Sequence, residues 1–207
     1  MHVIIDYGMG NLSSVKRAFE KLGIDVVISS EKQDLINADS LILPGVGAFR
    51  DAMAALNSSG LSDTIKEQVA KGKYLLGICL GMQLLYERSC EHGEYDGLGL
   101  ISGNIEYLNV ELKIPHMGWN NLKFNKSDPI LKYINEDEYV YFVHSYCALS
   151  DNSELVAYSE YGRMIPAIVR SGSIYGIQFH PEKSGDTGMN ILRAYREIIQ
   201  GSEGGTQ

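Results

Sequence analysis

The sequence is short of basic residues and cysteine and lacks any long apolar run, and each shortage argues against a class of protein. Its 18 lysines and arginines stand against 26 aspartates and glutamates, so the net charge of −8 argues against binding to nucleic-acid phosphates. Three cysteines do not make a disulfide framework in a chain of this length. No segment approaches the ~18 consecutive apolar residues that cross a bilayer. The first residues, MHVIIDYG, lack the basic region of a signal peptide, so we expect a soluble, reduced, cytoplasmic protein.

The rest of the composition is that of an ordinary globular protein. Hydrophobic residues make up 44% and charged residues 21% of the 207 residues, which suits one well-packed α/β domain and is too little for two large ones. The chain has no internal repeat and no low-complexity linker. We therefore expect a single domain over residues 1–200, followed by a disordered tail over residues 201–207.

The first half of the chain alternates short apolar runs with helical patterns. This order predicts parallel strands joined by right-handed crossovers, in a doubly wound α/β sheet with helices on both faces. Ser30 to Gln33 has capping-box spacing for one helix, and the run MQLLYER at 82–88 predicts another. The remaining expected elements are strands at 3–5, 26–28, 41–43 and 74–76 and helices at 12–22, 49–56 and 61–69.

The second half is richer in strand patterns joined by short polar turns. We expect its strands to form a partly antiparallel extension of the same sheet. A last amphipathic helix carries Leu192, Tyr195 and Ile199. The expected strand segments are Val140–Ala148, Leu155–Ser159, Ala167–Arg170 and Ser173–Phe179.

Two glycines follow the first strand, at Gly8 and Gly10. In a dinucleotide-binding fingerprint a third glycine would stand at Ser13, so the sequence fails that test. A tight turn at the carboxyl edge of the sheet is the better interpretation, and such edges are where α/β proteins bind their ligands.

Cys79 lies between Gly77 and Gly81, after an expected strand and before a helix-forming run. This strand–turn–helix layout is that of a nucleophile elbow, with cysteine in place of serine. Small residues are needed two positions on either side because the turn is tight. The free N–H groups at the start of the helix favour a thiolate. The alternative is that Cys79 is only a small core residue, as many free cysteines are.

A cysteine nucleophile needs a base and a group that orients the base, and His180 and Glu182 fit these two roles. Side chains two apart in an extended backbone fall on the same side, so Glu182 can accept a proton from one His180 nitrogen while the other faces Cys79. Pro181 stiffens the link between them. Taken alone, His-Pro-Glu would be interpreted as a turn that ends a strand.

Acyl transfer also needs an oxyanion hole, because negative charge develops on a former carbonyl oxygen. The N–H of Leu80, directly after the nucleophile, is one natural donor. The other donor can be the N–H of Val46 in the segment PGVG at 44–47, whose glycines let the backbone turn its N–H groups outward. The alternative for this segment is a rigid turn with no catalytic role.

Other reactive residues carry weaker patterns. Cys90 with His92 falls short of the ligand count of a zinc site, so we expect no metal, and no motif calls for a cofactor. Cys147 lies in a strand pattern and is interpreted as a core residue. His116 and His144 lie in motifs, but the sequence alone assigns them no chemical role.

The motifs PGVGAF, GICLGMQ and FHPE, in this order, resemble those of the class I, triad-type glutamine amidotransferases. In that family they form the oxyanion loop, the nucleophile, and the base with its orienting carboxylate. More narrowly, the sequence is similar to the glutaminase subunits of the imidazole glycerol phosphate synthases of histidine biosynthesis. The narrower resemblance rests on DYGMGN at 6–11, PHMGWN at 115–120, YFVHSY at 141–146 and HPEKS at 180–184. It covers nearly the whole chain, to about residue 199.

The resemblance implies an activity. Cys79 would attack the side-chain amide of glutamine, His180 would protonate the leaving ammonia, and water would hydrolyse the thioester. The ammonia would pass to a (β/α)8-barrel cyclase subunit, which makes imidazole glycerol phosphate and aminoimidazole carboxamide ribotide. Positions that match the family around the bound glutamine are Gly47, Gln83, Glu91, Ser145 and Tyr146. Positions that match the family at or near the subunit interface are Met9, Gly10, Asn11, Trp119, Tyr141 and Lys183.

Three alternatives remain open at this point. A paralogue could supply ammonia for the amination of a surface-sugar precursor through a different barrel partner. A stand-alone cysteine hydrolase could share the doubly wound fold. A non-catalytic scaffold is the third, although the intact set of Cys79, His180 and Glu182 counts against it. We also expect the Val46 N–H to rest turned away from the site and to turn inward when partner and ligand bind, because a glutaminase acting alone would waste glutamine.

Overall fold

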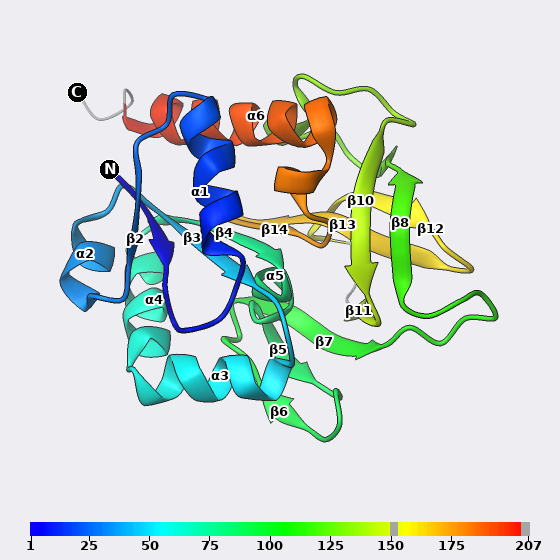
Figure 1. The fold of residues 1–207 in the computed structure, drawn as a ribbon, viewed down its shortest axis with the longest axis horizontal. Helices are drawn as coiled ribbons and strands as arrows, with labels where there is room; N and C mark the ends of the chain where they lie inside the picture. Colours follow the sequence, from blue (N-terminus) through cyan, green and yellow to red (C-terminus); the bar gives the residue numbers. More distant parts are fainter. Residues whose placement is uncertain (150–152, 204–207) are drawn as a thin grey trace.

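The computed structural model describes residues 1–149 and 153–203 as an α/β fold built on one large sheet (Figure 1). Its strands are β1 (His2–Ile5), β2 (Val26–Ser29), β3 (Ser40–Gly45), β4 (Tyr74–Cys79), β9 (Lys123–Phe124), β12 (Leu155–Glu160), β13 (Met164–Ser171) and β14 (Ile174–Ile177). They lie in the order β2-β1-β3-β4-β14-β13-β12-β9. The first five in this order are parallel, and β13, β12 and β9 are added antiparallel. The predicted doubly wound sheet with an antiparallel extension is confirmed.

Helices cover both faces of this sheet. They are α1 (Leu12–Lys21), α2 (Lys32–Asn37), α3 (Phe49–Ser58), α4 (Leu61–Ala70), α5 (Leu80–Gln83) and α6 (Gly185–Glu203). In β1, Ile4 packs in the core that includes α1 and α6, whereas Val3 and Ile5 pack in the core that includes α2, α3 and α4. Figure 1 shows α1 and α6 on one side of the sheet and α3 and α4 on the other. Because both faces are buried, the central strands β3, β4 and β14 are largely apolar, as the sequence pattern predicted.

Two smaller sheets lie beside the main one. The first contains β5 (Tyr86–Ser89), β6 (Tyr95–Asp96), β7 (Ile101–Tyr107) and β11 (Tyr146–Leu149), and the second is the antiparallel pair β8 (His116–Asn121) and β10 (Tyr139–His144). Two short 3-10 helices complete the fold, η1 (Pro129–Leu131) and η2 (Pro181–Lys183). None of the helices in the described residues combines the length and apolarity that a bilayer span needs.

The strand expected over Val140–Ala148 is wrong as a single element of the main sheet. Its residues divide at Ser145 into β10, which pairs with β8, and β11, which pairs with β7. Buried apolar residues occur on both sides of the division, from Val140 to Ala148. The alternation of burial over β10 ends at His144, and in β11 the adjacent residues Cys147 and Ala148 are both buried. Because the residues on both sides of Ser145 are of strand-forming types, their sequence alone does not reveal the change of pairing partner.

The helix expected over MQLLYER is also wrong beyond its first residues. Helix α5 ends at Gln83, and Tyr86–Ser89 forms strand β5 instead. The Tyr86 side chain is fully buried, and its strand pairs with β6 and β7. Burial of Tyr86 and pairing with two neighbouring strands here outweigh the helix propensity of the run.

The capping box over Ser30–Gln33 does not form. The N-cap of α2 is Glu31, which makes no side-chain capping bond. The hydroxyl of Ser29 takes the place of that cap, because it accepts the Glu31 N–H and donates to Asp34.

The chain end also differs from expectation. Helix α6 continues to Glu203, three residues into the expected tail, while residues 204–207 lie outside the described residues.

Candidate active site

Cys79 ends β4 in a backbone conformation that a side chain rarely adopts, with φ 56° and ψ −112°. The glycines around it are required by close packing. A Cβ on Gly77 would lie 2.7 Å from the Gly81 carbonyl oxygen, and one on Gly81 would overlap the carbonyl oxygen of Leu43. The turn therefore has the geometry of a nucleophile elbow, with the Cys79 side chain at the start of α5.

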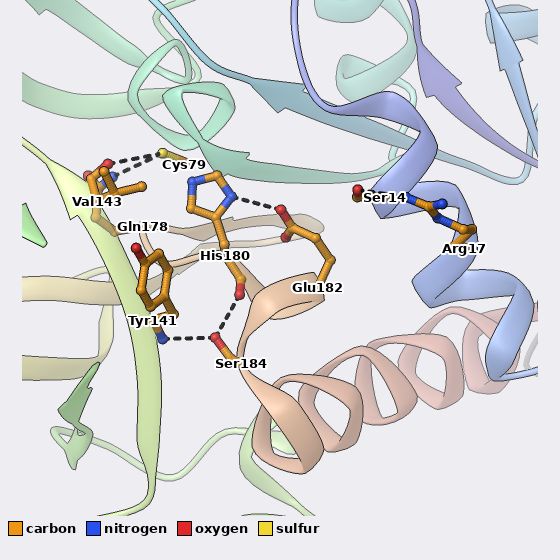
Figure 2. A network of polar contacts seen from close by, with 9 residues as sticks. All are labelled: Ser14, Arg17, Cys79, Tyr141, Val143, Gln178, His180, Glu182 and Ser184. Carbon is orange, nitrogen blue, oxygen red and sulfur yellow. Dashed lines mark hydrogen bonds and ion pairs between the residues drawn. The ribbon is translucent and has the colours of Figure 1, made fainter. Parts of the chain in front are cut away.

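His180 and Glu182 follow β14, the neighbour of β4 in the sheet. The Nδ1–H of His180 donates to Oε1 of Glu182 over 2.8 Å, and both side chains are buried. Figure 2 shows the imidazole between Cys79 and the carboxylate, with its other nitrogen on the side of the sulfur. The structure thus brings together the three residues that the sequence separates.

The environment of His180 favours its charged form. Burial alone would lower the pKa of His180, but side-chain hydrogen bonds to Cys79 and Glu182 outweigh it and raise the pKa to about 9. An imidazolium next to sulfur, held by a carboxylate behind it, is the arrangement that a cysteine nucleophile requires.

Ser184 holds the base in place, and sequence reasoning missed it. Its hydroxyl donates to the His180 carbonyl over 2.6 Å and accepts the Tyr141 N–H over 2.9 Å (Figure 2). The His180 N–H also donates to the Tyr141 carbonyl. The two bonds to Tyr141 fasten the segment after β14 to strand β10, and the bond between Ser184 and His180 closes that segment on itself. The motif HPEKS contains Ser184, but its spacing gave no sign of this contact.

A cavity of about 380 Å³ opens beside Cys79. It brings together every residue that the family resemblance places around glutamine, both expected oxyanion donors, the nucleophile and the base. Glu182 does not line it. Its lining is Val46, Gly47, Cys79, Leu80, Gln83, Glu91, His92, Val143, His144, Ser145, Tyr146 and His180. Of these, His92, Val143 and His144 were not predicted as site residues.

Glu91 has a structural contact as well as a place in this cavity. Its Oε2 accepts the N–H of Phe49, the first residue of α3, over 2.7 Å. A carboxylate at a helix N-terminus is favoured by the free N–H groups and the macrodipole. The bond fixes one oxygen of Glu91 at the wall of the cavity.

The expected oxyanion loop borders the same cavity. Pro44 and Gly45 end β3, and Gly47 has φ +101°, a conformation that favours glycine. The Tyr7 hydroxyl donates to the Pro44 carbonyl over 2.9 Å, which fixes the peptide before Gly45. The peptide that carries the Val46 N–H therefore follows the anchored carbonyl of Pro44 and precedes the flexible Gly47.

The residues expected at a subunit interface lie around this edge of the molecule. A Cβ on Gly47 would lie 2.9 Å from the Met9 side chain, so the turn after β1 contacts the oxyanion loop. Trp119 on β8 packs edge-to-face against Tyr141 on β10, with ring centroids 6.0 Å apart. Lys183 follows Glu182 directly in η2.

The remaining reactive residues do not gather into a metal site. Cys90 is exposed and Cys147 is buried. Burial raises the pKa of the Cys147 thiol to about 11, as suits a core residue. Within residues 1–149 and 153–203, no group of three histidine, cysteine or acidic side chains is arranged to hold a metal ion.

The model of the glutamine amidotransferase class-I family matches residues 3–196. The chain is 50% identical to the imidazole glycerol phosphate synthase subunit HisH of Oceanobacillus iheyensis over 97% of its own length and 100% of the relative. It is 46% identical to the protein of the same name from Listeria monocytogenes, over the full length of both chains. A crystal structure of a glutamine amidotransferase superimposes with a TM-score of 0.76 at 22% identity, covering 96% of this chain and 98% of the other. That likeness shows the fold.

Proposed function

The chain belongs to the class-I glutamine amidotransferases and, within them, to the HisH subunits of imidazole glycerol phosphate synthase, and from this premise we propose how its site works. It hydrolyses glutamine to glutamate and ammonia, and it delivers the ammonia to a (β/α)8-barrel cyclase subunit in histidine biosynthesis. We assign this activity to a single domain over residues 1–200 of a cytoplasmic protein. The observation that carries the proposal is that Cys79 and His180 line the cavity together while Glu182 holds the far side of the His180 ring.

The first step forms a covalent intermediate. The Cys79 thiolate attacks the side-chain carbonyl carbon of glutamine, and the C=O electrons move onto oxygen. When this tetrahedral intermediate collapses, the C–N bond breaks and His180 gives its proton to the departing nitrogen, so ammonia leaves and a glutamyl thioester remains. A pKa of His180 near 9 keeps this proton available at neutral pH.

The second step restores the enzyme. Neutral His180 takes a proton from water as the water oxygen attacks the thioester carbonyl. The C–S bond then breaks, and glutamate and the Cys79 thiolate leave the intermediate. Glu182 keeps Nδ1 of His180 protonated throughout, so the nitrogen that faces sulfur is the one that exchanges protons.

The oxyanion of both intermediates needs donors at the cavity wall. The Leu80 N–H, at the first residue of α5, is one of them, and the Val46 N–H is the second when its peptide is turned inward. Gly45 and Gly47 on either side of Val46 allow that rotation without a side-chain clash.

Glutamine fits the remaining polar groups of the cavity. The carboxylate of Glu91 suits the α-ammonium group of the substrate, while backbone N–H groups near Gly47 and Ser145 suit its α-carboxylate. Gln83 uses its amide N–H groups on Tyr146 and Gln178, so its carbonyl oxygen is the atom that remains for a substrate donor.

The cyclase subunit would bind at the aromatic face, defined here as Met117, Trp119, Tyr139 and Tyr141 on the β8–β10 pair. In the antiparallel register Trp119 lies opposite Tyr141, so these side chains share one surface. Met117, Trp119 and Tyr139 are each more than half exposed, at 61%, 56% and 57%. Large apolar side chains grouped on a surface mark an interaction site. The face begins beside Val143 in the cavity wall, so a partner there would receive ammonia close to its source.

The proposal is tested by purifying the chain together with the candidate cyclase and measuring glutamine-dependent cyclisation. We expect a stable complex that makes the cyclised product from glutamine. Ammonia release at the full rate without a partner would favour a stand-alone hydrolase. A complex with a barrel partner that aminates a sugar precursor would favour the paralogue.

A further inference from the structure

A buried glutamine touches the reacting sulfur. Gln178 lies between β14 and His180 and is fully buried. Its Nε2 is 4.0 Å from the Cys79 sulfur, and Figure 2 shows both side chains at the same end of the site. A buried amide in an otherwise apolar stretch, IYGIQF, is costly unless its hydrogen bonds are made.

The orientation of this amide is fixed by two neighbours. The Tyr146 carbonyl can only accept, so the side-chain atom of Gln83 that lies 2.9 Å from it is the NH₂ group. The same NH₂ group lies 3.1 Å from Gln178, so the Gln178 atom facing it is the carbonyl oxygen. The NH₂ group of Gln178 must then lie on the opposite side of its amide, toward the sulfur.

We infer that Gln178 is a further catalytic residue, which donates an N–H to the Cys79 sulfur and stabilises its thiolate. The donors run in one direction, from Gln83 to Gln178 to sulfur, and hydrogen bonds in such a chain polarise one another. The inference rests on the proposed role of Cys79 as the nucleophile. It assigns Gln178 a chemical role in addition to a packing role.

The sulfur has a contact suited to each of its protonation states. The Val143 carbonyl lies 4.0 Å away and can accept the S–H of the thiol, whereas it would repel a thiolate. Gln178 and the His180 imidazolium both favour the thiolate. Tyr7 is another titratable group near the sulfur, and burial followed by the charge of Cys79 raises the pKa of its phenol, so Tyr7 stays neutral. His144 is also neutral, because burial lowers its pKa to about 3.

The test measures the thiolate directly, by the pH dependence of Cys79 alkylation with iodoacetamide. The experiment uses the full chain carrying Cys90→Ser, because Cys90 is exposed and would react, whereas Cys147 is buried. Gln178→Glu keeps an acceptor for Gln83 but places an oxygen against the sulfur. Gln178→Met removes both amide groups at similar length.

We expect the alkylation midpoint to rise by about one pH unit in both Gln178 variants, which is a roughly tenfold lower rate below the midpoint. Gln83→Met should raise it less, because it only frees the orientation of Gln178. The matched control is Gln68→Met. Gln68 is another buried glutamine, on α4, and its Nε2 has no hydrogen-bond partner within the described part of the chain. This control should leave the midpoint unchanged.

The outcomes separate this inference from the proposed function. A wild-type midpoint in folded Gln178 variants, even with lowered thermal stability, would overturn the catalytic role and leave a packing role. If neither Gln178 variant folds, Gln83→Met decides, and an unshifted midpoint there counts against the donor chain. Alkylation needs no glutamine, so failure of the wild-type chain in complex with the cyclase to hydrolyse glutamine would contradict the proposed function without affecting the alkylation result.

Discussion

His116 and His144 form a buried pair in which Nδ1 of His116 lies 3.1 Å from Nε2 of His144. The Nδ1–H of His144 donates to the Tyr146 carbonyl, which can only accept, so its Nε2 is free to accept from His116. The other His116 nitrogen accepts from the side-chain NH₂ of Asn120. Each ring therefore carries its proton on Nδ1. His144 ends β10 and its hydrogen bond reaches Tyr146, the first residue of β11, and both residues line the cavity, whereas His116 lies on β8.

This pair predicts a loss of stability in mild acid. Burial lowers the pKa of His116 to about 4 and that of His144 to about 3. Since the ordinary pKa is about 6.5, the unfolded chain binds protons first as the pH falls, so the contribution of this pair to stability is full above pH 6.5 and decreases below it. At pH 5 each histidine should cost on the order of 2 kcal/mol of unfolding free energy. Urea unfolding at pH 5 and pH 7.5 measures the difference.

A variant isolates the contribution of the pair. His116 is stacked between Phe142 and Tyr161, so His116→Phe preserves the stacking and removes one titrating group. Its unfolding free energy should depend less on pH between 5 and 7.5 than that of the wild type. An equally steep dependence would show that other groups control acid stability.

Replacing the nucleophile should separate the two halves of the reaction. In Cys79→Ser the serine hydroxyl is a much weaker nucleophile than a thiolate, so glutamine hydrolysis should be abolished. The complex with the cyclase should still make product when ammonium salts replace glutamine. Glutamine hydrolysis and ammonium-dependent product formation are both measured on the same preparation of the complex. Glutamine hydrolysis that survives in this variant would contradict the role given to Cys79.

Glu182→Gln should lower kcat without a matching change in KM, because Glu182 does not line the substrate cavity. The amide no longer stabilises the imidazolium, and kcat should fall by roughly 10²–10⁴. The pKa of His180 should drop below its present value of about 9, so the alkaline limb of the rate profile should move to lower pH. The control is Glu197→Gln, because Glu197 lies on α6 at the surface and pairs there with Lys132, away from the site. If the alkaline limb of the pH–rate profile stays in place in Glu182→Gln, Glu182 does not raise the pKa of His180.

The same pairing has a linked effect on stability. Because the folded pKa of His180 is raised, its contribution is present below pH 6.5 and is lost as the pH rises through about 9. This is opposite in sign to the buried pair of His116 and His144. In Glu182→Gln the unfolding free energy should therefore depend less on pH between 6.5 and 9, and its dependence below pH 6.5 should be unchanged. Urea unfolding across these two pH ranges measures both effects.

The sequence could predict that Cys79, His180 and Glu182 lie together because two local signals combine with the motif resemblance. Gly77 and Gly81 mark the elbow, and spacing alone places Glu182 beside His180. The meeting of Cys79 with His180 depends on strand order, since β14 lies parallel to β4 with Ile177 opposite Ile78. No local pattern specifies that neighbour, and the motif resemblance supplied it.

The parts that sequence reasoning missed depend on long-range contacts. Gln178 is a polar residue in an otherwise apolar strand pattern, and such a residue indicates a buried hydrogen-bonding role. Its partners, Gln83 and Cys79, come from distant parts of the chain. Ser184 was not predictable, because its partner Tyr141 lies on another sheet. The division of strands at Ser145 falls within one run of strand-forming residues, and β5 forms because β6 and β7 pair with it.

The aromatic face predicts where the partner binds. Trp119 is 56% exposed and packs edge-to-face on Tyr141, so its truncation removes a large rigid contact. If Trp119 is central to the interface, Trp119→Ala should cost about 2 kcal/mol or more, a rise in Kd of roughly 30-fold. Ile36→Ala is the matched control, because Ile36 is an exposed apolar residue on α2, at the opposite end of the molecule in Figure 1. Titration calorimetry with the cyclase measures both, and equal affinities for the two variants would move the interface elsewhere.

Partner binding should increase glutamine hydrolysis through the Val46 peptide. Gain of one oxyanion donor is worth on the order of 10²–10³ in rate, so we expect activation of that size when the cyclase and its ligand are added. Equal rates with and without the cyclase would remove the reason for a switch.

A glycine variant tests whether the loop is the moving part. Gly47→Ala places a methyl group against Met9 at a φ of +101°, so it should reduce the activated rate far more than the basal rate. Gly23→Ala controls for backbone strain, because Gly23 also has positive φ but has nothing within 4 Å of the added carbon. Comparing the ratio of activated to basal rates in the two variants separates strain from contact. Full activation in Gly47→Ala would mean that the donor is already turned inward before the partner binds, and that the partner acts on the reaction by another route.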